Sequence, residues 1–154
     1  MGRERLESKG SNDKSESRFM KAKSDLCPCC SGHGYDACCG RLLKGESANT
    51  AEQLMRSRYT AYALDDEKYL FETWHHSTRP QTLDLSQQNT IKWVGLKILG
   101  HSVDAKNPAS ARVEFVARYK LNGKAQKMHE LSDFVYQEDR WFYVDGKHVE
   151  LSKI

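Results

Sequence analysis

Closely spaced cysteines mark the segment of this sequence that is best equipped for chemistry. In CPCCSGHGYDACCG, residues 27–40, Cys27 and Cys29 form one pair, and Cys38 and Cys39 form a second. Two such pairs, joined by a short loop that contains glycine, can direct thiolates at a single metal ion. The alternatives are cysteines that serve as small buried apolar residues or that pair as disulfides. A metal site is favoured, because all five cysteines of the chain fall within this segment.

A site filled by four protein thiolates is structural and not catalytic, because it leaves no coordination position for water or substrate. Zn²⁺ is the ion that we expect, since it prefers four tetrahedral ligands and binds thiolates readily. Iron is also held by thiolate sites, so the sequence leaves that alternative open.

The cysteine segment resembles the SEC-C motif, the zinc-binding tail of the SecA translocation ATPase. That motif reads C-x-C-x-S-G-x-x-x-x-x-C, followed by His or Cys and then Gly. The matching positions are Cys27, Cys29, Ser31, Gly32, Cys38, Cys39 and Gly40. The resemblance implies that the cysteines of the two pairs are the metal ligands, and that Tyr35 is the aromatic residue that braces the knuckle.

Two features of the segment depart from the motif. Cys30 stands where the family usually has glycine; a bystander role is favoured, with a spare ligand and an oxidation-sensitive thiol as the alternatives. The loop HGYDA, residues 33–37, has no lysine, whereas the loop of the motif is usually lysine-rich. In SecA-like tails the motif docks on the SecB chaperone and on the ribosome. The resemblance therefore implies a ribosome or an export chaperone as the kind of partner to expect.

The composition describes a chain with a small net charge and no membrane-spanning segment. The formal charge is +3, and thiolates around a divalent ion would lower it, which argues against nucleic acid as the partner. No stretch approaches the roughly 20 apolar residues of a membrane span, and the N-terminus lacks the apolar segment of a secretory signal. We therefore expect a cytoplasmic protein, in which disulfides do not persist. Residues 1–25 are almost devoid of apolar side chains and are predicted to be disordered.

Two helices are predicted after a short linker at residues 41–47. Thr50 followed by Gln53 is a capping-box pattern, so the first helix should begin there. Its apolar residues share one stripe, with Arg58 in the middle: Ala51, Leu54, Met55, Tyr59 and Tyr62. A second helix is predicted over residues 65–76, because acidic residues in its first turn suit the helix dipole.

The second half of the chain is predicted to form an antiparallel sheet. Residues 91–99 are a β-branched and apolar run, and residues 111–121 alternate between apolar and mostly charged side chains. Asn122-Gly123 provides the two positive φ angles of a type I′ hairpin turn, and a further turn is expected at Glu138-Asp139. Helices first and an antiparallel sheet after them make the fold class α+β.

A second resemblance rests on segments spread along the chain: LMRSRYTAYALDDEKYLFETWH, WVGLKI, VEFVARYK, HELSDF and RWFYVDG. With the N-terminal motif, they resemble the bacterial YchJ family. That family joins SEC-C to a nuclear-transport-factor-two-like domain, a cone of helices wrapped against a strongly curved antiparallel sheet. The resemblance implies a tail at residues 1–25, a zinc knuckle at residues 26–41 and the cone-shaped domain at residues 48–152. It implies no particular activity. Sheet faces of this fold often pair, so a homodimer stays open.

A cone of this kind usually encloses a pocket between the sheet and the helices. The candidates for its lining are Arg58, Tyr59, Trp74, His75, Glu130 and Ser132. Glu130 and Ser132 lie on one predicted strand. The face of this strand that we expect to point into the pocket holds Glu130, Ser132, Phe134 and Tyr136. We expect Arg58 to pair with Glu130, because an unpaired buried charge is costly. A pair that only fixes the packing is the alternative to a ligand-binding or catalytic pair. No nucleophile motif is present, so no catalytic residue is assigned.

The leading hypothesis is a non-enzymatic binding or adaptor protein whose zinc knuckle recognises another protein. Basic residues flank the knuckle and either make it locally basic or form a solvated surface: Lys21, Lys23, Arg41 and Lys44. The alternative is an enzyme or small-molecule binder that acts through the pocket. RNA binding through tail and knuckle is a third hypothesis, which the tail disfavours because it is nearly charge-balanced and lacks interleaved aromatic residues.

Overall fold

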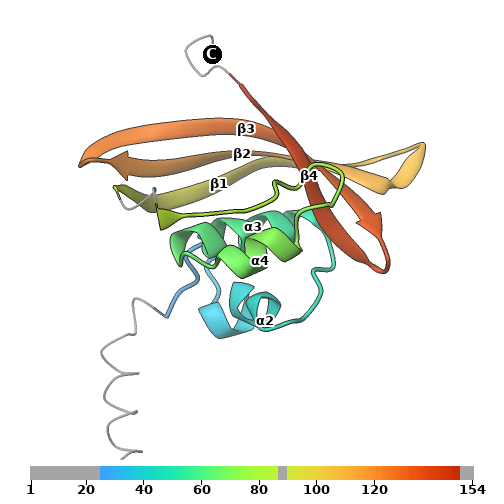
Figure 1. Ribbon diagram of the computed structural model, residues 1–154, viewed down its shortest axis with the longest axis horizontal. Helices are drawn as coiled ribbons and strands as arrows, with labels where there is room; N and C mark the ends of the chain where they lie inside the picture. The colour runs from blue at the N-terminus through green and yellow to red at the C-terminus, as the bar shows by residue number, and fades with distance from the viewer. Residues whose placement is uncertain (1–24, 87–89, 150–154) are drawn as a thin grey trace, which may run out of the picture.

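The structure is a computed structural model that describes residues 25–86 and 90–149. Helices cover one face of a curved antiparallel sheet, and the cysteine segment with its short helix lies on the side of these helices away from the sheet (Figure 1). This arrangement confirms the predicted α+β class and the cone of helices against a curved sheet. The tail predicted to be disordered, residues 1–25, lies outside the described residues except for Asp25, and so do Lys21 and Lys23.

The sheet is a meander in which each strand pairs with the next one along the chain. Its strands are β1 (Ile91–Asp104), β2 (Asn107–Leu121), β3 (Lys124–Gln137) and β4 (Arg140–His148). Register shifts interrupt the pairing of β1 with β2 at three places and that of β3 with β4 at one. Such irregularities bend strands and increase their twist, in agreement with the strong curvature in Figure 1.

Both predicted hairpin turns are confirmed. Asn122 and Gly123 have φ angles of 50° and 83°, and Glu138 and Asp139 have φ angles of 55° and 66°. Positive φ at both central residues is the requirement of a type I′ turn, whose own twist matches that of the flanking strands.

The predicted alternation along β2 is confirmed for most of its apolar face. The buried members are Ala111, Val113, Phe115 and Ala117, whereas Tyr119 is half-buried and Leu121, the last residue of the strand, is exposed. On β3 the expected inward face holds for the buried Ser132 and Phe134. Tyr136 departs from the expectation, because it stays 42% exposed with its ring beside that of Trp141.

Helix α3 (Ala51–Ala63) begins at the predicted residue. The hydroxyl oxygen of Thr50 accepts a hydrogen bond from the backbone N–H of Gln53 at 3.1 Å. The amide oxygen of Gln53 accepts in return from the backbone N–H of Asn49 at 2.8 Å, one residue earlier than in the usual reciprocal box. Most of the predicted apolar stripe is buried, and Arg58 is buried with it.

The second predicted helix is shorter than expected. Helix α4 spans Glu67–Glu72, with Asp66 as its N-cap. The residues after it pair with β4 instead: the N–H of Tyr143 donates to the carbonyl of Thr73 at 2.9 Å, and the N–H of His75 donates to the carbonyl of Tyr143 at 2.7 Å. The prediction of helix up to residue 76 is therefore wrong, because a distant strand provides these backbone groups with partners.

The segment predicted as a linker is partly helical. Helix α2 (Cys39–Leu43) follows a single turn of 3₁₀ helix, η1 (Tyr35–Ala37). Residues of the knuckle and α2 belong to the same buried core as α3: Cys27, Cys29, Cys39, Leu42, Ala51 and Leu54. The knuckle is therefore packed on the domain and not suspended from it.

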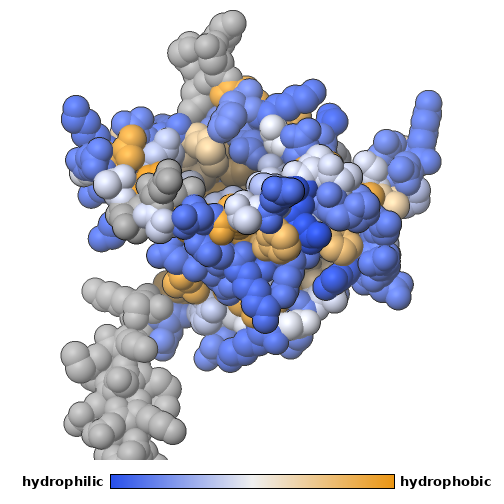
Figure 2. All heavy atoms as spheres, viewed as in Figure 1, coloured by the Kyte–Doolittle hydropathy of each residue, from blue (hydrophilic) through white to orange (hydrophobic). Residues whose placement is uncertain are grey.

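The surface is mostly hydrophilic on the face that Figure 2 shows, with separate apolar patches between charged side chains. Among the described residues, no helix has the length and the apolar character that crossing a membrane would need.

The N-cap of α3 gives the first testable prediction. Replacing Thr50 with Ala should lower the free energy of unfolding by about 1 kcal/mol, because the N–H of Gln53 loses its acceptor. Urea denaturation of the purified protein measures the change. Thr50→Ser is the matched control, since its hydroxyl preserves the cap. An alanine variant as stable as the serine variant would contradict the assigned role.

Candidate metal centre

The four cysteines of the two pairs converge on one point. The sulfur atoms of Cys27, Cys29, Cys38 and Cys39 all lie within 4.8 Å of one another. A tetrahedral ion bound at about 2.3 Å to each sulfur would place the sulfurs about 3.8 Å apart. The Cys29 and Cys38 sulfurs are separated by 3.7 Å. The cluster can therefore hold a metal ion, and its donor set suits Zn²⁺.

Local backbone hydrogen bonds fold the N-terminal half of the knuckle. The N–H of Cys27 donates to the carbonyl of His33 at 2.9 Å, and the N–H of Tyr35 donates to the carbonyl of Asp25 at 2.7 Å. Between these two bonds the chain reverses direction at Gly32, whose φ of 89° is readily available only to glycine. The reversal brings the first cysteine pair back towards Cys38.

The second pair is positioned by a close contact between Tyr35 and Gly40. A β-carbon at Gly40 would lie 2.7 Å from the Tyr35 carbonyl oxygen and 2.9 Å from its ring. Only glycine fits there, so Tyr35 rests against the first turn of α2. This contact agrees with the bracing role that the resemblance implies, and it fixes the start of the helix that carries Cys39.

The fifth cysteine lies apart from the cluster. Cys30 is exposed, and its sulfur is 3.6 Å from the carbonyl oxygen of Pro28. Its φ angle of 67° lies in the left-handed region, which explains why a glycine suits this position in the motif. The three cysteines Cys27, Cys29 and Cys39 are buried and Cys38 is half-buried, so the geometry supports the bystander interpretation of Cys30.

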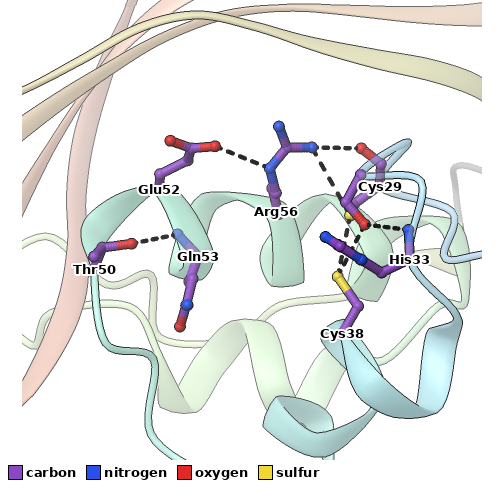
Figure 3. A network of polar contacts seen from close by, with 8 residues as sticks. Cys29, His33, Cys38, Thr50, Glu52, Gln53 and Arg56 are labelled. Atoms are coloured by element: carbon purple, nitrogen blue, oxygen red, sulfur yellow. Dashed lines mark hydrogen bonds and ion pairs between the residues drawn. The ribbon is translucent and has the colours of Figure 1, made fainter.

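Polar groups from the loop and from α3 surround the sulfurs (Figure 3). Arg56 donates through Nη1 to the carbonyl of Cys29 at 2.9 Å, and the same nitrogen lies 3.9 Å from the Cys29 sulfur. Its Nε is held by the carboxylate of Glu52 at 3.1 Å. On the loop side, Ser31 Oγ lies 3.2 Å from the Cys38 sulfur. Arg56 thus places a positive charge beside the thiolates that a metal requires.

The thiols compete for protons when no cation is bound. Hydrogen bonds with the thiols of Cys29 and Cys39 lower the pKa of Cys27. Hydrogen bonds to Cys27 and Cys29, together with burial, raise the pKa of Cys39. One thiolate therefore forms at the expense of the others. A divalent cation removes this conflict, since metal binding displaces the protons from all its thiol ligands.

The pocket residues expected from the sequence are only partly brought together. A cavity of about 310 Å³ lies between α3 and the sheet, and Arg58, Tyr59, Glu130 and Ser132 line it. Trp74 and His75 are not among the residues that line this cavity. The ring of His75 lies elsewhere, with Nε2 2.6 Å from the amide oxygen of Gln137.

The predicted pair of Arg58 with Glu130 is wrong for the described part of the chain. Arg58 donates through Nη1 to the carbonyl of Leu70 at 2.8 Å and to Thr73 Oγ1 at 2.7 Å. Its guanidinium also lies over the ring of Tyr143, 4.4 Å from the centroid. The carboxylate of Glu130 instead accepts from Ser132 Oγ at 2.8 Å. The groups that contact the cation are therefore a helix carbonyl, a threonine hydroxyl and the aromatic rings of Tyr143 and Trp74, all of them uncharged.

Several residues of the two sites were missed in the sequence. The only sequence feature that points to Arg56 is its position four residues after Glu52, a spacing that allows an ion pair on a helix. Tyr143 was recognisable as part of an aromatic strand, but its contact with Arg58 depends on how β4 crosses the helices. Trp93, whose ring meets that of Tyr59 at 5.7 Å, lines the cavity from β1.

The cluster predicts that metal content depends on the four convergent cysteines and not on the fifth. Cys38→Ser should lose the bound metal, because a neutral hydroxyl is a poor replacement for a thiolate ligand. Cys30→Ser is the matched control and should retain one equivalent. Elemental analysis of zinc and iron in the purified variants measures both. Equal loss from the two variants would mean that Cys30 is a ligand.

Arg56 is expected to strengthen metal binding without touching the ion. Arg56→Met should weaken metal affinity about 10–100-fold, as loss of a group that supports ligands typically does, because the four thiolates around a divalent ion leave a net negative charge. Competition with a chromogenic chelator measures the affinity. Arg79→Met is a suitable control, since that guanidinium lies over the ring of Phe71, 4.3 Å from its centroid. Unchanged affinity in the Arg56 variant would exclude this electrostatic role.

Comparison with known proteins places the fold and the site in one family. The family model of the YchJ middle domain, which is NTF2-like, matches residues 50–146. A UPF0225 protein from Chromobacterium violaceum is 47% identical over 133 residues, which cover 82% of this chain and 98% of that protein. The solution structure of a SEC-C motif containing protein from Rhodopseudomonas palustris has a TM-score of 0.72 at 38% identity, with 80% of this chain and 98% of that chain covered. A SEC-C motif containing protein from Psychrobacter arcticus has a TM-score of 0.64 at 28% identity, with 80% and 82% covered. The chain belongs to the YchJ family of SEC-C motif proteins.

Proposed function

We propose that this chain is a cytoplasmic zinc protein without catalytic activity, in which the knuckle is a recognition module for another protein. The observation that carries the proposal is the convergence of four thiol groups within 4.8 Å on a knuckle that is packed against α3. Four protein ligands complete a tetrahedral zinc site. Such a site holds a surface in shape and offers no position at which a substrate could bind the metal.

Zinc is favoured over iron by the chemistry of the site. Zn²⁺ has no redox activity, and it is the usual ion of closed structural sites that are built from cysteine alone. The knuckle has little secondary structure of its own, with only η1 and the short α2. The ion would therefore supply much of its stability, as in other small zinc modules.

A polar hollow beside the cluster is the surface that we assign to the partner. It has a volume of about 400 Å³ and is lined from both the knuckle and α3. Cys38 and Arg41 lie on one side of it, and Glu52 and Arg56 lie on the other. The hollow depends on the knuckle and helix being held together, so loss of the metal should disturb it. The SEC-C resemblance favours a ribosome or an export chaperone as the partner.

A second candidate function is supported by the cavity between α3 and the sheet. Its volume of about 310 Å³ lies in the range of small-molecule sites, and both charged and aromatic residues line it. Binding of a small molecule in this cavity is compatible with the adaptor role of the knuckle, because the cavity and the hollow share no lining residue.

The adaptor proposal is tested with purified ribosomes and purified SecB chaperone as separate probes. A double charge reversal, Arg41→Glu with Lys44→Glu, should weaken binding to the true partner about tenfold or more, because it reverses two positive charges next to the cysteine cluster. Lys92→Glu with Lys120→Glu is the matched control; these two exposed lysines pair across β1 and β2. Co-sedimentation and surface plasmon resonance measure the two probes.

A Cys38→Ser variant tests whether the metal is needed for partner binding or only holds the knuckle in shape. Loss of zinc together with loss of binding supports the recognition module. Loss of zinc with unchanged binding, or equal effects of the two double charge reversals, would contradict the adaptor role of the knuckle.

A further inference from the structure

Aromatic rings form much of the wall of the cavity between α3 and the sheet. Trp93 of β1 is at the centre of this wall, with ring centroids 5.7 Å from Tyr59, 6.1 Å from Tyr62 and 5.2 Å from Tyr119. The rings come from a helix and from two strands, so the wall is held by the fold itself. Such a surface favours a planar, apolar ligand body through stacking and edge contacts.

The same cavity contains a cation that lacks a carboxylate partner among the described residues. Arg58 is only 3% exposed, and burial lowers the pKa of its guanidinium. Its described hydrogen bonds both use Nη1 and reach neutral oxygens, those of Leu70 and Thr73. Neutral acceptors and the rings of Tyr143 and Trp74 offset only part of the cost of burying a full charge. The guanidinium therefore still favours an anion.

A carboxylate lines the cavity as well. Glu130 on β3 is fixed by the hydroxyl of Ser132, which donates to Oε2 at 2.8 Å. Its side chain lies over Gly146 of β4, where a β-carbon would be 2.6 Å from the carboxyl carbon of Glu130. A glycine thus leaves the room that the carboxylate occupies. Among the described residues, no ion pair joins Glu130 to Arg58, although both face the same cavity.

The rest of the described lining is uncharged at neutral pH. The remaining side chains are aliphatic, thioether, aromatic or hydroxyl-bearing, and burial raises the pKa of the Tyr59 hydroxyl to about 12. The cavity thus carries one positive and one negative group on a largely aromatic wall. A ligand with a single charge would leave one of these groups unmatched, whereas a ligand with both charges matches each of them at no net charge.

We propose that this cavity binds a small zwitterion with an aromatic body, a compound of the aromatic α-amino acid class. Its carboxylate binds the guanidinium of Arg58, its ammonium group binds the carboxylate of Glu130, and its ring lies against Trp93. The proposal deepens the second candidate function and is independent of the knuckle. It requires no chemical conversion of the ligand.

The test compares three ligands that differ in one charged group each, on the unmodified, metal-loaded protein. Phenylalanine carries both charges, phenethylamine lacks the carboxylate, and 3-phenylpropionate lacks the ammonium group. The indole N–H signal of Trp93 in ¹H–¹⁵N NMR spectra reports on the cavity, and isothermal titration calorimetry gives the dissociation constants. We expect phenylalanine to shift the Trp93 signal and to bind at least tenfold more tightly than either analogue.

Two results would overturn the proposal, and they have different consequences for ligand binding in the cavity. If an analogue binds as tightly as phenylalanine, the zwitterion preference is wrong, but ligand binding in the cavity remains. If none of the three compounds shifts the Trp93 signal at millimolar concentration, the proposal fails and the second candidate function loses this support with it. Neither result bears on the knuckle.

Glu130→Gln provides a variant that keeps the shape of the side chain. It should reduce the preference for phenylalanine over 3-phenylpropionate to about one, because the ammonium group loses its anion. Glu114→Gln is the matched control; its carboxylate lies 2.7 Å from His129 Nε2 and does not line the cavity. A preserved preference in the Glu130 variant, with an unchanged unfolding midpoint, would overturn the assigned role of Glu130.

Discussion

Helix α3 is enclosed from two sides, and the structure depends on how its buried polar side chains find partners. The sheet covers one side, and the knuckle with α2 covers the other (Figure 1). An unpaired buried donor or acceptor costs about 1–3 kcal/mol, so each polar residue on this helix needs a partner. Ser57 meets the hydroxyl of Tyr69 on α4 at 2.6 Å. Thr60 lies 3.7 Å from the sulfur of Cys27 in the knuckle. The helix is therefore the element through which knuckle, α4 and sheet are held together.

Two arginines on this helix show how strongly the environment decides what a side chain does. Arg56 and Arg58 are two residues apart, which places them about 200° apart around the helix axis. Arg56 faces the knuckle, where a carboxylate and a thiol lie beside it. Arg58 points away from the knuckle and meets the carbonyl of Leu70 on α4 and the ring of Tyr143 on β4. The same residue type thus borders the cysteine cluster on one side and lines a cavity on the other, and the helix keeps the two sites separate.

The parts of the structure that were predictable from the sequence are those that short segments determine. The cap at Thr50 and the turn at Asn122-Gly123 involve neighbouring residues only, and the cysteine pairs converge across one short loop. The partner of Arg58 could not be predicted in this way, because Tyr143 reaches it only through the path of β4. The segment after α4 was predicted as helix for the same reason, since the strand that claims its backbone groups lies far along the chain. Geometry that neighbouring residues determine can be predicted from one sequence, whereas contacts between distant elements can be identified only once the fold is known.

The glycine at position 146 limits which amino acids evolution can accept on the neighbouring strand. Its missing side chain is the space in which the carboxylate of Glu130 lies. A methyl group at position 146 would push the Glu130 carboxylate out of this space, away from the hydroxyl of Ser132. A substitution at position 146 therefore acts first on Glu130, although 15 residues separate the two positions in the chain.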